Sequence, residues 1–250
     1  MIINFSLVLP CYNEEENIFH LYNEFKKIPL TNEKAEIVFV NNGSVDGTEK
    51  KIDDILEDSR INKNLGIVVK KINLAKNEGY GGGITAGLKS AAGEYIGWAH
   101  ADLQTPLMDF YKLYTLVKSE KKVFGKGNRI NNRGYDSVIS RFHEACASLI
   151  LGQKMREINA QPKIFHKSML SLFRNMPKEW TTIDTYVFYV CLLNRIKIIE
   201  MDVIFKTRVY GQSKWKNNFG SFIKHLFFNI VYLIKLRFSN ERNYTAKSNT

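Results

Sequence analysis

The segment Gly93-Glu94-Tyr95-Ile96-Gly97-Trp98-Ala99-His100-Ala101-Asp102-Leu103-Gln104-Thr105-Pro106 decides the fold of this chain. It has the pattern of a short apolar strand that ends in a polar, acid-bearing turn closed by proline. Alternate residues of a strand share a face, so His100, Asp102 and, if the chain stays extended, Gln104 point the same way. Imidazole, carboxylate and amide oxygen together can hold a divalent cation such as Mg²⁺ or Mn²⁺, and the cation can hold a diphosphate. The alternative is an ordinary polar turn after a strand.

The rest of the chain alternates between strand and helix patterns. Strands are predicted at residues 3–9, 35–40, 67–74, 95–99, 122–125 and 196–205, and helices at 13–27, 44–57, 84–92, 107–120, 137–151 and 184–194. Strands separated by helices predict an α/β fold with a mostly parallel central sheet flanked by helices on both faces. With 250 residues the chain is long enough for one large domain of this kind.

Polar segments follow each of the first three predicted strands. The side chains of interest are Pro10, Tyr12, Asn13 and Glu14 after the first, Asn41, Asn42, Ser44 and Asp46 after the second, and Asn77, Gly79 and Gly81 after the third. In open α/β sheets such strand ends bind ligands. An aromatic ring and amides can stack on a nucleobase and hydrogen-bond it, and glycines let the backbone approach a ligand closely. The alternative is a set of capped helices, with Asn13 as an N-cap and acids in the first turn.

Charge is unevenly distributed along the chain. The net charge is +11, and the last 45 residues hold nine basic residues against one acid. An anionic membrane surface, a phosphorylated substrate or nucleic acid can each explain a basic end. No nucleic-acid module signature accompanies it, so we do not expect a nucleic-acid partner. Three widely spaced cysteines match neither a disulfide framework nor a zinc site, which favours the reducing cytoplasm.

Apolar residues recur at helical spacing between 219 and 238, with basic residues beside them. We expect a basic amphipathic helix over 216–238, followed by a flexible tail over 239–250. The uninterrupted apolar stretch is far short of the roughly 20 residues that span a bilayer. The helix therefore docks on its own domain, residues 1–215, or lies in a membrane interface.

Together the motifs resemble the family 2 glycosyltransferases of the GT-A fold over residues 1–215. The resemblance is nearest the branch that contains dolichyl-phosphate mannosyltransferase and bacterial polyprenyl-phosphate sugar transferases. The matched positions are Pro10, Tyr12, Asn13, Glu14, Gly43, Ser44, Asp46, Gly47, Thr48, Asn77, Gly79, Gly81, Asp102, Leu103, Gln104, Pro106, Arg208, Gly211, Ser213 and Lys214. The departures are Asn41 and Asn42 in place of two acids, and His100 in place of the first acid of the metal motif.

The resemblance implies an inverting transfer of a sugar from a UDP- or GDP-linked donor to a polyprenyl phosphate. It places the base near Tyr12, Asn41 and Asn42, and the diphosphate on a cation at Asp102, Gln104 and His100. It also implies that Arg208 and Lys214 stabilise the leaving diphosphate and that Ser213 donates a hydrogen bond. The expected location is the cytoplasm, peripheral on the inner face of the cell membrane.

The same resemblance implies roles for Arg129, which would meet a phosphate, and for Asp184, which would be a general base. A base is needed only for a hydroxyl acceptor, because a lipid phosphate is already ionised near neutral pH. A saccharide or glycolipid hydroxyl in surface-polysaccharide assembly is therefore the alternative acceptor. A non-catalytic nucleotide-sugar binding protein is the third possibility. Without a functional role, Asp184 would be an ordinary N-cap, and Arg129 and Arg208 would be solvated surface residues.

Overall fold

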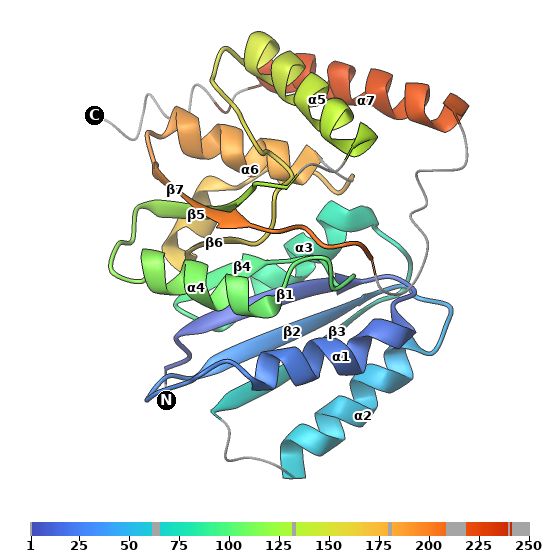
Figure 1. The fold of residues 1–250 in the computed structure, drawn as a ribbon, viewed down its shortest axis with the longest axis vertical. Coiled ribbons are helices and arrows are strands. Elements are labelled where there is room, and N and C mark those ends of the chain that lie inside the picture. The colour runs from blue at the N-terminus through green and yellow to red at the C-terminus, as the bar shows by residue number, and fades with distance from the viewer. Residues whose placement is uncertain are drawn as a thin grey trace.

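The central sheet of the computed structural model runs through the middle of the molecule (Figure 1). The structure describes residues 2–61, 66–131, 134–179, 182–208, 219–239 and 241, and in this part of the chain the sheet has seven strands in the order β3-β2-β1-β4-β6-β5-β7. The strands are β1 (Phe5–Cys11), β2 (Ala35–Asn42), β3 (Ile67–Leu74), β4 (Tyr95–Trp98), β5 (Val123–Arg129), β6 (Lys163–His166) and β7 (Lys197–Val203). The predicted α/β class with a mostly parallel sheet is confirmed.

Helices cover both faces of the sheet and form two separate cores. One face carries α1 (Glu15–Lys26), α2 (Thr48–Ile61) and α4 (Leu107–Val117). The other carries α3 (Gly79–Ser90), α5 (Tyr135–Leu151), the 3₁₀ helix η2 (Lys167–Leu172), α6 (Thr182–Leu193) and α7 (Phe219–Arg237). Alternation along β1 feeds both cores, since Val8 joins the α3 side while Leu7 and Leu9 join the α1 side.

Helix α3 lies unusually close to the sheet because of Gly87. A Cβ atom on Gly87 would stand 2.2 Å from Cγ1 of Val8 and 3.0 Å from Cγ2 of Val40. The missing side chain lets the helix backbone rest directly on β1 and β2. This contact fixes the helix whose amino end faces the polar edge of the sheet.

Three elements differ from the sequence-based expectation, and one of them is the unpredicted 3₁₀ helix η2 (Lys167–Leu172). Strand β6 was not predicted, because four residues with Lys163 and His166 at the ends give no alternation to detect. It pairs antiparallel with both β4 and β5 and buries Lys163 completely. Helix α3 begins at Gly79, five residues before the predicted start, so the glycines belong to its first turn.

The last helix packs side by side with α5 and also contacts α6 (Figure 1). Leu233 and Leu236 are buried in the core on this face. Arg237 donates from Nη1 to the backbone carbonyl of Leu151 at 2.7 Å, which fastens the carboxyl ends of α5 and α7 together. None of the helices in the described segments is both long enough and apolar enough to cross a membrane.

Only Ser239 and Glu241 of the expected tail, residues 239–250, are described. Glu241 is buried, and its Oε1 accepts hydrogen bonds from Nδ2 of Asn175 at 2.7 Å and from the hydroxyl of Tyr186 at 3.1 Å. The chain just beyond α7 is therefore bound to the body of the protein.

Candidate functional site

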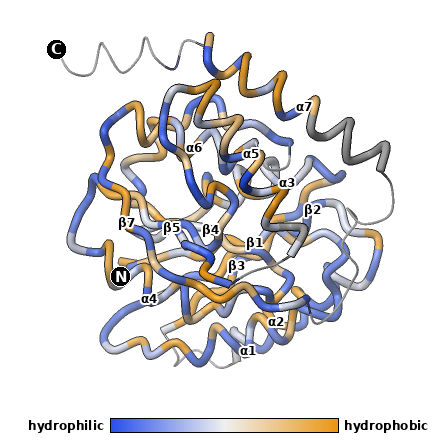
Figure 2. Tube along the Cα trace, turned by 45° about the horizontal axis from the view of Figure 1, so that its top comes forward, coloured by the Kyte–Doolittle hydropathy of each residue, from blue (hydrophilic) through white to orange (hydrophobic). Residues whose placement is uncertain are grey.

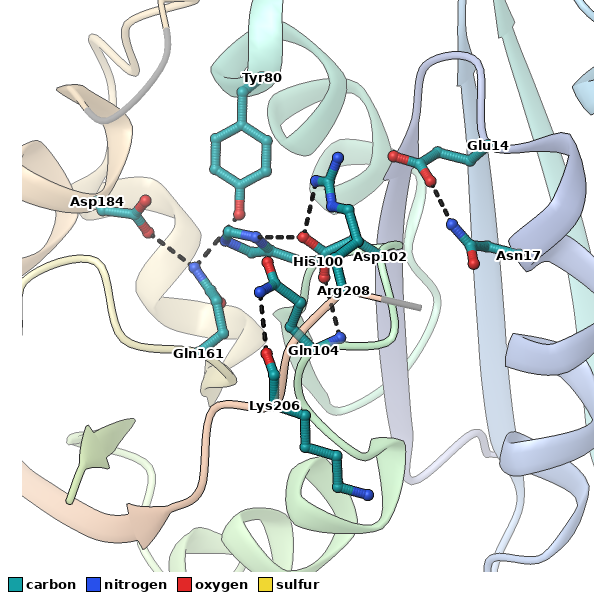
Figure 3. A network of polar contacts seen from close by, with 10 residues as sticks. All are labelled: Glu14, Asn17, Tyr80, His100, Asp102, Gln104, Gln161, Asp184, Lys206 and Arg208. Carbon is teal, nitrogen blue, oxygen red and sulfur yellow. Dashed lines mark hydrogen bonds and ion pairs between the residues drawn. The ribbon is translucent and has the colours of Figure 1, made fainter. Parts of the chain in front are cut away.

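The polar loops that follow β1, β2, β3 and β4 meet at one edge of the sheet. These four strands are parallel neighbours, so their carboxyl ends lie on the same side. Figure 3 shows the side chains that gather there, with Asp102, His100 and Arg208 at the centre and Glu14 on the β1 side. The edge is the position at which open α/β sheets bind ligands.

Hydrogen bonds join the loops after β1 and β2. Asn13 accepts at Oδ1 from the backbone N–H of Val45 at 2.9 Å, and its own N–H donates to Oγ of Ser44 at 3.1 Å. Asp46 accepts at Oδ2 from the N–H of Glu15 at 3.3 Å. Asn13 therefore does not cap α1 as expected: the helix starts after Glu14 without a side-chain cap, because Val45 takes the Asn13 oxygen.

Asn42 fastens the next loop to the sheet. Its Nδ2 donates to the carbonyl of Gly79 at 2.8 Å, and its Oδ1 accepts from the N–H of Glu78 at 2.9 Å. Asn77 accepts from the N–H of Gly79 at 2.8 Å. A carboxylate at position 42 has no hydrogen to donate to the Gly79 carbonyl, which gives a physical reason for an amide at this position.

Neighbouring Asn41 is also buried in protein contacts. Its Oδ1 accepts from the N–H of Ser44 at 3.2 Å, and its Nδ2 lies 3.5 Å from Oε2 of Glu49. The two asparagines thus shape the turn that was expected to meet a nucleoside. Tyr12 and Pro10 lie beside this turn, and Tyr12 is half-buried.

The glycines of the first turn of α3 approach the protein's own chain. A Cβ atom on Gly81 would stand 2.2 Å from the carbonyl oxygen of Pro177, and one on Gly79 would stand 2.5 Å from that of Lys178. Gly79 also has a φ of +78°, in the left-handed region that favours glycine. The close approach expected for a ligand is made here by the segment that precedes α6.

Asp102 is the centre of the charged network at this edge. It is buried, and Arg208 donates from Nη2 to its Oδ2 at 2.9 Å, while the N–H of Gln104 donates to its Oδ1 at 3.1 Å. Nδ1 of His100 lies 3.6 Å from the same Oδ2. Burial opposes ionisation of Asp102, but His100, Arg208 and the Gln104 N–H outweigh it and hold the pKa of the carboxyl well below its usual range.

Gln104 does not point with His100 and Asp102, contrary to the sequence-based expectation. Leu103 has a φ of +59°, so the chain turns at this point instead of staying extended. The Gln104 side chain donates from Nε2 to the backbone carbonyl of Lys206 at 3.0 Å, and the backbone carbonyl of Gln104 accepts from the Lys206 N–H at 2.8 Å. These two bonds hold the segment after β7 across the edge and place Arg208 on Asp102.

His100 and Asp102 are a suitable pair of ligands for a divalent cation. Two ligands of one cation, each at about 2.1 Å, lie roughly 3 Å apart, and the Nδ1–Oδ2 separation of 3.6 Å needs only a small adjustment. Within the described ranges, no cluster of three or more His, Cys, Asp and Glu side chains could hold a metal. A cation held by His100 and Asp102 would therefore need further ligands beyond these two side chains.

Glu14 adds a second carboxyl to the same edge (Figure 3). It accepts at Oε2 from Nδ2 of Asn17 at 2.5 Å. Burial raises the pKa of Glu14, and the charge of Asp102 adds to the rise, while the Asn17 hydrogen bond, Arg208 and His100 oppose it.

Arg129 ends β5 close to the His100 region. Its Nε pairs with Glu157, its Cζ lies 6.0 Å from the ring centre of Phe205, and that ring lies 6.3 Å from the ring of His100. The Nη2 atom of Arg129 is buried and lacks a hydrogen-bond partner among the described residues. Arg129 is therefore not solvated surface, and it holds one unused donor.

Asp184 is buried at the start of α6 and is paired with Lys163. Nζ of Lys163 donates to its Oδ1 at 2.5 Å, and Nε2 of Gln161 donates to the same oxygen at 3.2 Å. Burial lowers the pKa of Lys163 to about 8, and the Asp184 charge opposes this fall. Asp184 is the third residue of α6 and not its N-cap, and its carboxylate is paired with a buried lysine. Its role as a general base stays a prediction.

Tyr80 joins this buried pair to the polar edge, and the sequence did not reveal its role. Nε2 of Gln161 lies 3.3 Å from the hydroxyl of Tyr80, whose ring meets the His100 ring edge-on at 5.3 Å (Figure 3). The one hint in the sequence that Tyr80 has a role at this edge is its position as a large side chain among four glycines. Lys163 gave no such signal, because Gln161 and Pro162 precede it and only two apolar residues, Ile164 and Phe165, follow before His166. The two remaining predicted residues, Ser213 and Lys214, lie outside the described part of the chain.

Solved structures identify the class of fold. The chain superimposes on glucosyl-3-phosphoglycerate synthase from Mycobacterium tuberculosis, solved with Mn²⁺, UDP and glucosyl-3-phosphoglycerate, with a TM-score of 0.60, 15% identity, and coverage of 94% of this chain and 78% of that one. A mannosyltransferase from Pyrobaculum calidifontis, solved with GDP-Man and Mn²⁺, gives a TM-score of 0.58 and 15% identity over 99% of this chain and 74% of that one. The fold is the GT-A glycosyltransferase fold.

The chain belongs to glycosyl transferase family 2, whose family model matches residues 6–200. It is 24% identical over 233 residues to undecaprenyl-phosphate 4-deoxy-4-formamido-L-arabinose transferase of Proteus mirabilis, covering 91% of this chain and 65% of that protein. It is 24% identical over 235 residues to dolichol-phosphate mannosyltransferase of Pyrococcus furiosus, covering 89% of this chain and 62% of that protein. The chain thus spans less than two thirds of the length of these relatives.

Proposed function

We propose that this protein transfers a sugar from a nucleotide-diphosphate sugar to a polyprenyl phosphate, with inversion at the sugar. The observation that carries the proposal is the charged network at the sheet edge, where Asp102, His100 and Arg208 meet. The nucleoside lies over the loops after β1 and β2, near Tyr12 and the Asn41–Asn42 turn. The donor is a UDP or GDP sugar, as in the solved relatives that hold UDP or GDP-Man.

The diphosphate end of the donor lies against Asp102 and Arg208. When bound by His100 and Asp102, Mg²⁺ or Mn²⁺ supplies positive charge to the diphosphate oxygens. Imidazole among the ligands favours Mn²⁺. Arg208 supplies a second positive charge, and Ser213 and Lys214 follow it in the sequence. These groups stabilise the negative charge that grows on the leaving oxygen.

The acceptor phosphate attacks from the side of β5 and β6. One of its oxygens forms a bond to the anomeric carbon while the bond from that carbon to the diphosphate breaks, and the electron pair leaves on the diphosphate oxygen. Arg129 holds the acceptor phosphate with its unused Nη2 donor. An ionised phosphate needs no general base, which agrees with the pairing of Asp184 to Lys163. The relatives from Proteus and Pyrococcus, named for lipid-phosphate acceptors, support this choice.

A lipid-linked acceptor places the protein at a membrane surface, on the inner face of the cell membrane where nucleotide sugars are available. The outer side of α7 provides apolar and basic side chains for this contact. The helix itself is anchored by Leu233 and Leu236, so its docking on the domain and its contact with lipid use opposite faces.

Equilibrium binding of UDP and GDP by calorimetry tests the site. We expect one nucleotide to bind more tightly with Mn²⁺ than with EDTA, and Asp102→Asn to remove the metal effect. Asp109→Asn, which changes an α4 carboxylate paired with Lys112, is the matched control. Equal binding by the wild type and Asp102→Asn with Mn²⁺ would contradict the proposed placement of the diphosphate.

A further inference from the structure

Where side chains are described, helices α5 and α7 together form a surface whose exposed side chains are apolar, small or basic. In residues 137–158 and 227–239, where side chains are described, no acidic and no uncharged polar side chain is exposed. The exposed residues are Val138, Arg141, Phe142, Ala145, Leu149, Gly152, Lys154, Arg156, Phe227, Phe228, Ile234, Lys235 and Phe238. We call this set the α5–α7 surface.

The exposed residues of each helix lie on one stripe. Val138, Phe142, Ala145 and Leu149 follow one another at spacings of four, three and four residues, which is one side of a helix. The opposite side of α5, with Ala147 and Leu151, enters the core. Leu149 is 85% exposed, although leucine is among the residues most often buried in soluble proteins.

The two stripes belong to neighbouring helices that bury their other sides in one core, with Ala147 and Leu151 from α5 and Leu233 and Leu236 from α7. The bond from Arg237 to the carbonyl of Leu151 joins their carboxyl ends, and both helices extend from there toward the same side of the molecule (Figure 1). With a rise of about 1.5 Å per residue, Phe142 and Phe227 lie at similar distances from this junction. Figure 2 shows the apolar character of the described part of α7 next to α5.

The composition differs from that of an ordinary exposed helix in the same protein. On α2 the exposed side chains in residues 48–60 are Glu49, Lys50, Asp53, Asp54, Glu57 and Arg60, so both signs occur and acids dominate. The α5–α7 surface combines apolar side chains with cations only. Phospholipid headgroups and the acyl region just below them match this combination, because aromatic and aliphatic groups enter the interface while lysine and arginine pair with anionic lipid.

We propose that the α5–α7 surface docks on an anionic lipid bilayer and that α5 is an equal part of the contact. The sequence suggested a membrane contact for the terminal helix alone. The structure adds Phe142 and Leu149, which belong to helix α5 much earlier in the chain. The sequence of helix α7, Phe219–Arg237, contains no acidic residue, so the whole helix is compatible with a negatively charged surface. The inference deepens the proposed function, because a lipid-linked acceptor resides in such a bilayer.

Vesicle co-sedimentation tests the inference without donor, acceptor or catalysis, so its failure is separate from failure of the transferase. The full chain is mixed with vesicles of phosphatidylcholine alone or with added phosphatidylglycerol, at low and high salt. We expect binding to the anionic vesicles that weakens with salt. Phe142→Ser with Leu149→Ser should lower the partition coefficient about ten-fold, because two apolar side chains no longer enter the interface.

The matched control is Ile2→Ser with Leu116→Ser, which removes two exposed apolar side chains outside the α5–α7 surface and should leave vesicle binding unchanged. Arg141→Gln with Lys154→Gln should weaken binding to the anionic vesicles alone. Equal binding by Phe142→Ser/Leu149→Ser and the wild type would overturn the role of α5. Light scattering that shows a dimer, disrupted by the same substitutions and without vesicle binding, would assign the surface to a second copy of the chain and overturn the lipid proposal.

Discussion

Arg208 and Asp102 form the central contact at the scale of single residues. They are 106 positions apart in the sequence, and the two bonds between Gln104 and Lys206 bring them together. The sequence identified both residues separately through the motifs that contain them. It did not reveal their pairing, because a contact between an interior loop and the segment after the last strand has no local pattern.

We expect Arg208→Ala to lower kcat/KM for nucleotide release by about 10²–10³-fold, since a positive group aimed at the leaving charge is lost. Arg208→Lys should recover part of the loss because the charge remains. Steady-state kinetics with a saturating acceptor measures both. Arg60→Ala, on the exposed side of α2, is the control and should behave like the wild type. Wild-type kinetics in Arg208→Ala would rule out this role.

The buried pair Lys163–Asp184 predicts a pH dependence of stability. Because the folded pKa of Lys163 is about 8, against an ordinary value of 10.5, the cost of burying its charge is present in full below pH 8. Above pH 8 the folded state releases the proton before the unfolded state does, so this contribution to the unfolding free energy rises with pH up to about 10.5.

Urea denaturation between pH 7.5 and 10 measures this effect against a reference without either charge. The reference is Lys163→Met with Asp184→Asn. We expect the unfolding free energy of the wild type to rise relative to the reference by about 1–3 kcal/mol over this range. A difference that stays constant or falls with pH would mean that the lysine is not held in a strongly desolvated site.

Helices and strands could be predicted where the hydrophobic pattern extends over many residues, and not where it covers only a few. The strands near residues 3–9, 35–40, 67–74 and 95–99 were found, because runs of branched and aromatic residues between turn signals mark them. Strand β6 was missed because its four residues take their stability from pairing with β4 and β5, which lie far away in the sequence. The start of α3 was missed because glycine lowers helix propensity, and the packing of Pro177 and Lys178 on those glycines overrides that preference.

At the scale of elements, the packing of α3 on the sheet predicts that Gly87→Ala lowers the free energy of unfolding by about 1–3 kcal/mol. Alanine normally stabilises a helix relative to glycine by roughly 0.5–1 kcal/mol, but here its methyl group would overlap Val8 and push α3 from β1. Chemical denaturation measures the change, and Lys89→Ala on the exposed side of α3 is the control. Increased stability in Gly87→Ala would show that α3 can shift away from the sheet at little cost.

At the scale of the whole molecule, the polar edge and the α5–α7 surface are linked along the chain. Ten residues join Arg208 to Phe219, the first residue of α7. We therefore propose that the same basic end of the chain supplies a charge for the diphosphate and a contact for the bilayer. The uneven charge in the sequence favours an anionic partner, and the structure adds α5, packed against α7, to the side of the molecule that we propose to meet the membrane.

A measurement of sugar transfer to a lipid phosphate tests the proposed function most directly. Nucleotide release is measured from a panel of UDP and GDP sugars with Mn²⁺, Mg²⁺ or EDTA, with and without polyprenyl phosphate, and the lipid product is identified by mass spectrometry. We expect release from one donor that rises with the lipid phosphate and yields a glycosylated polyprenyl phosphate. Release that ignores the lipid phosphate but rises with a saccharide acceptor, or nucleotide binding without turnover under every condition, would contradict the proposed function.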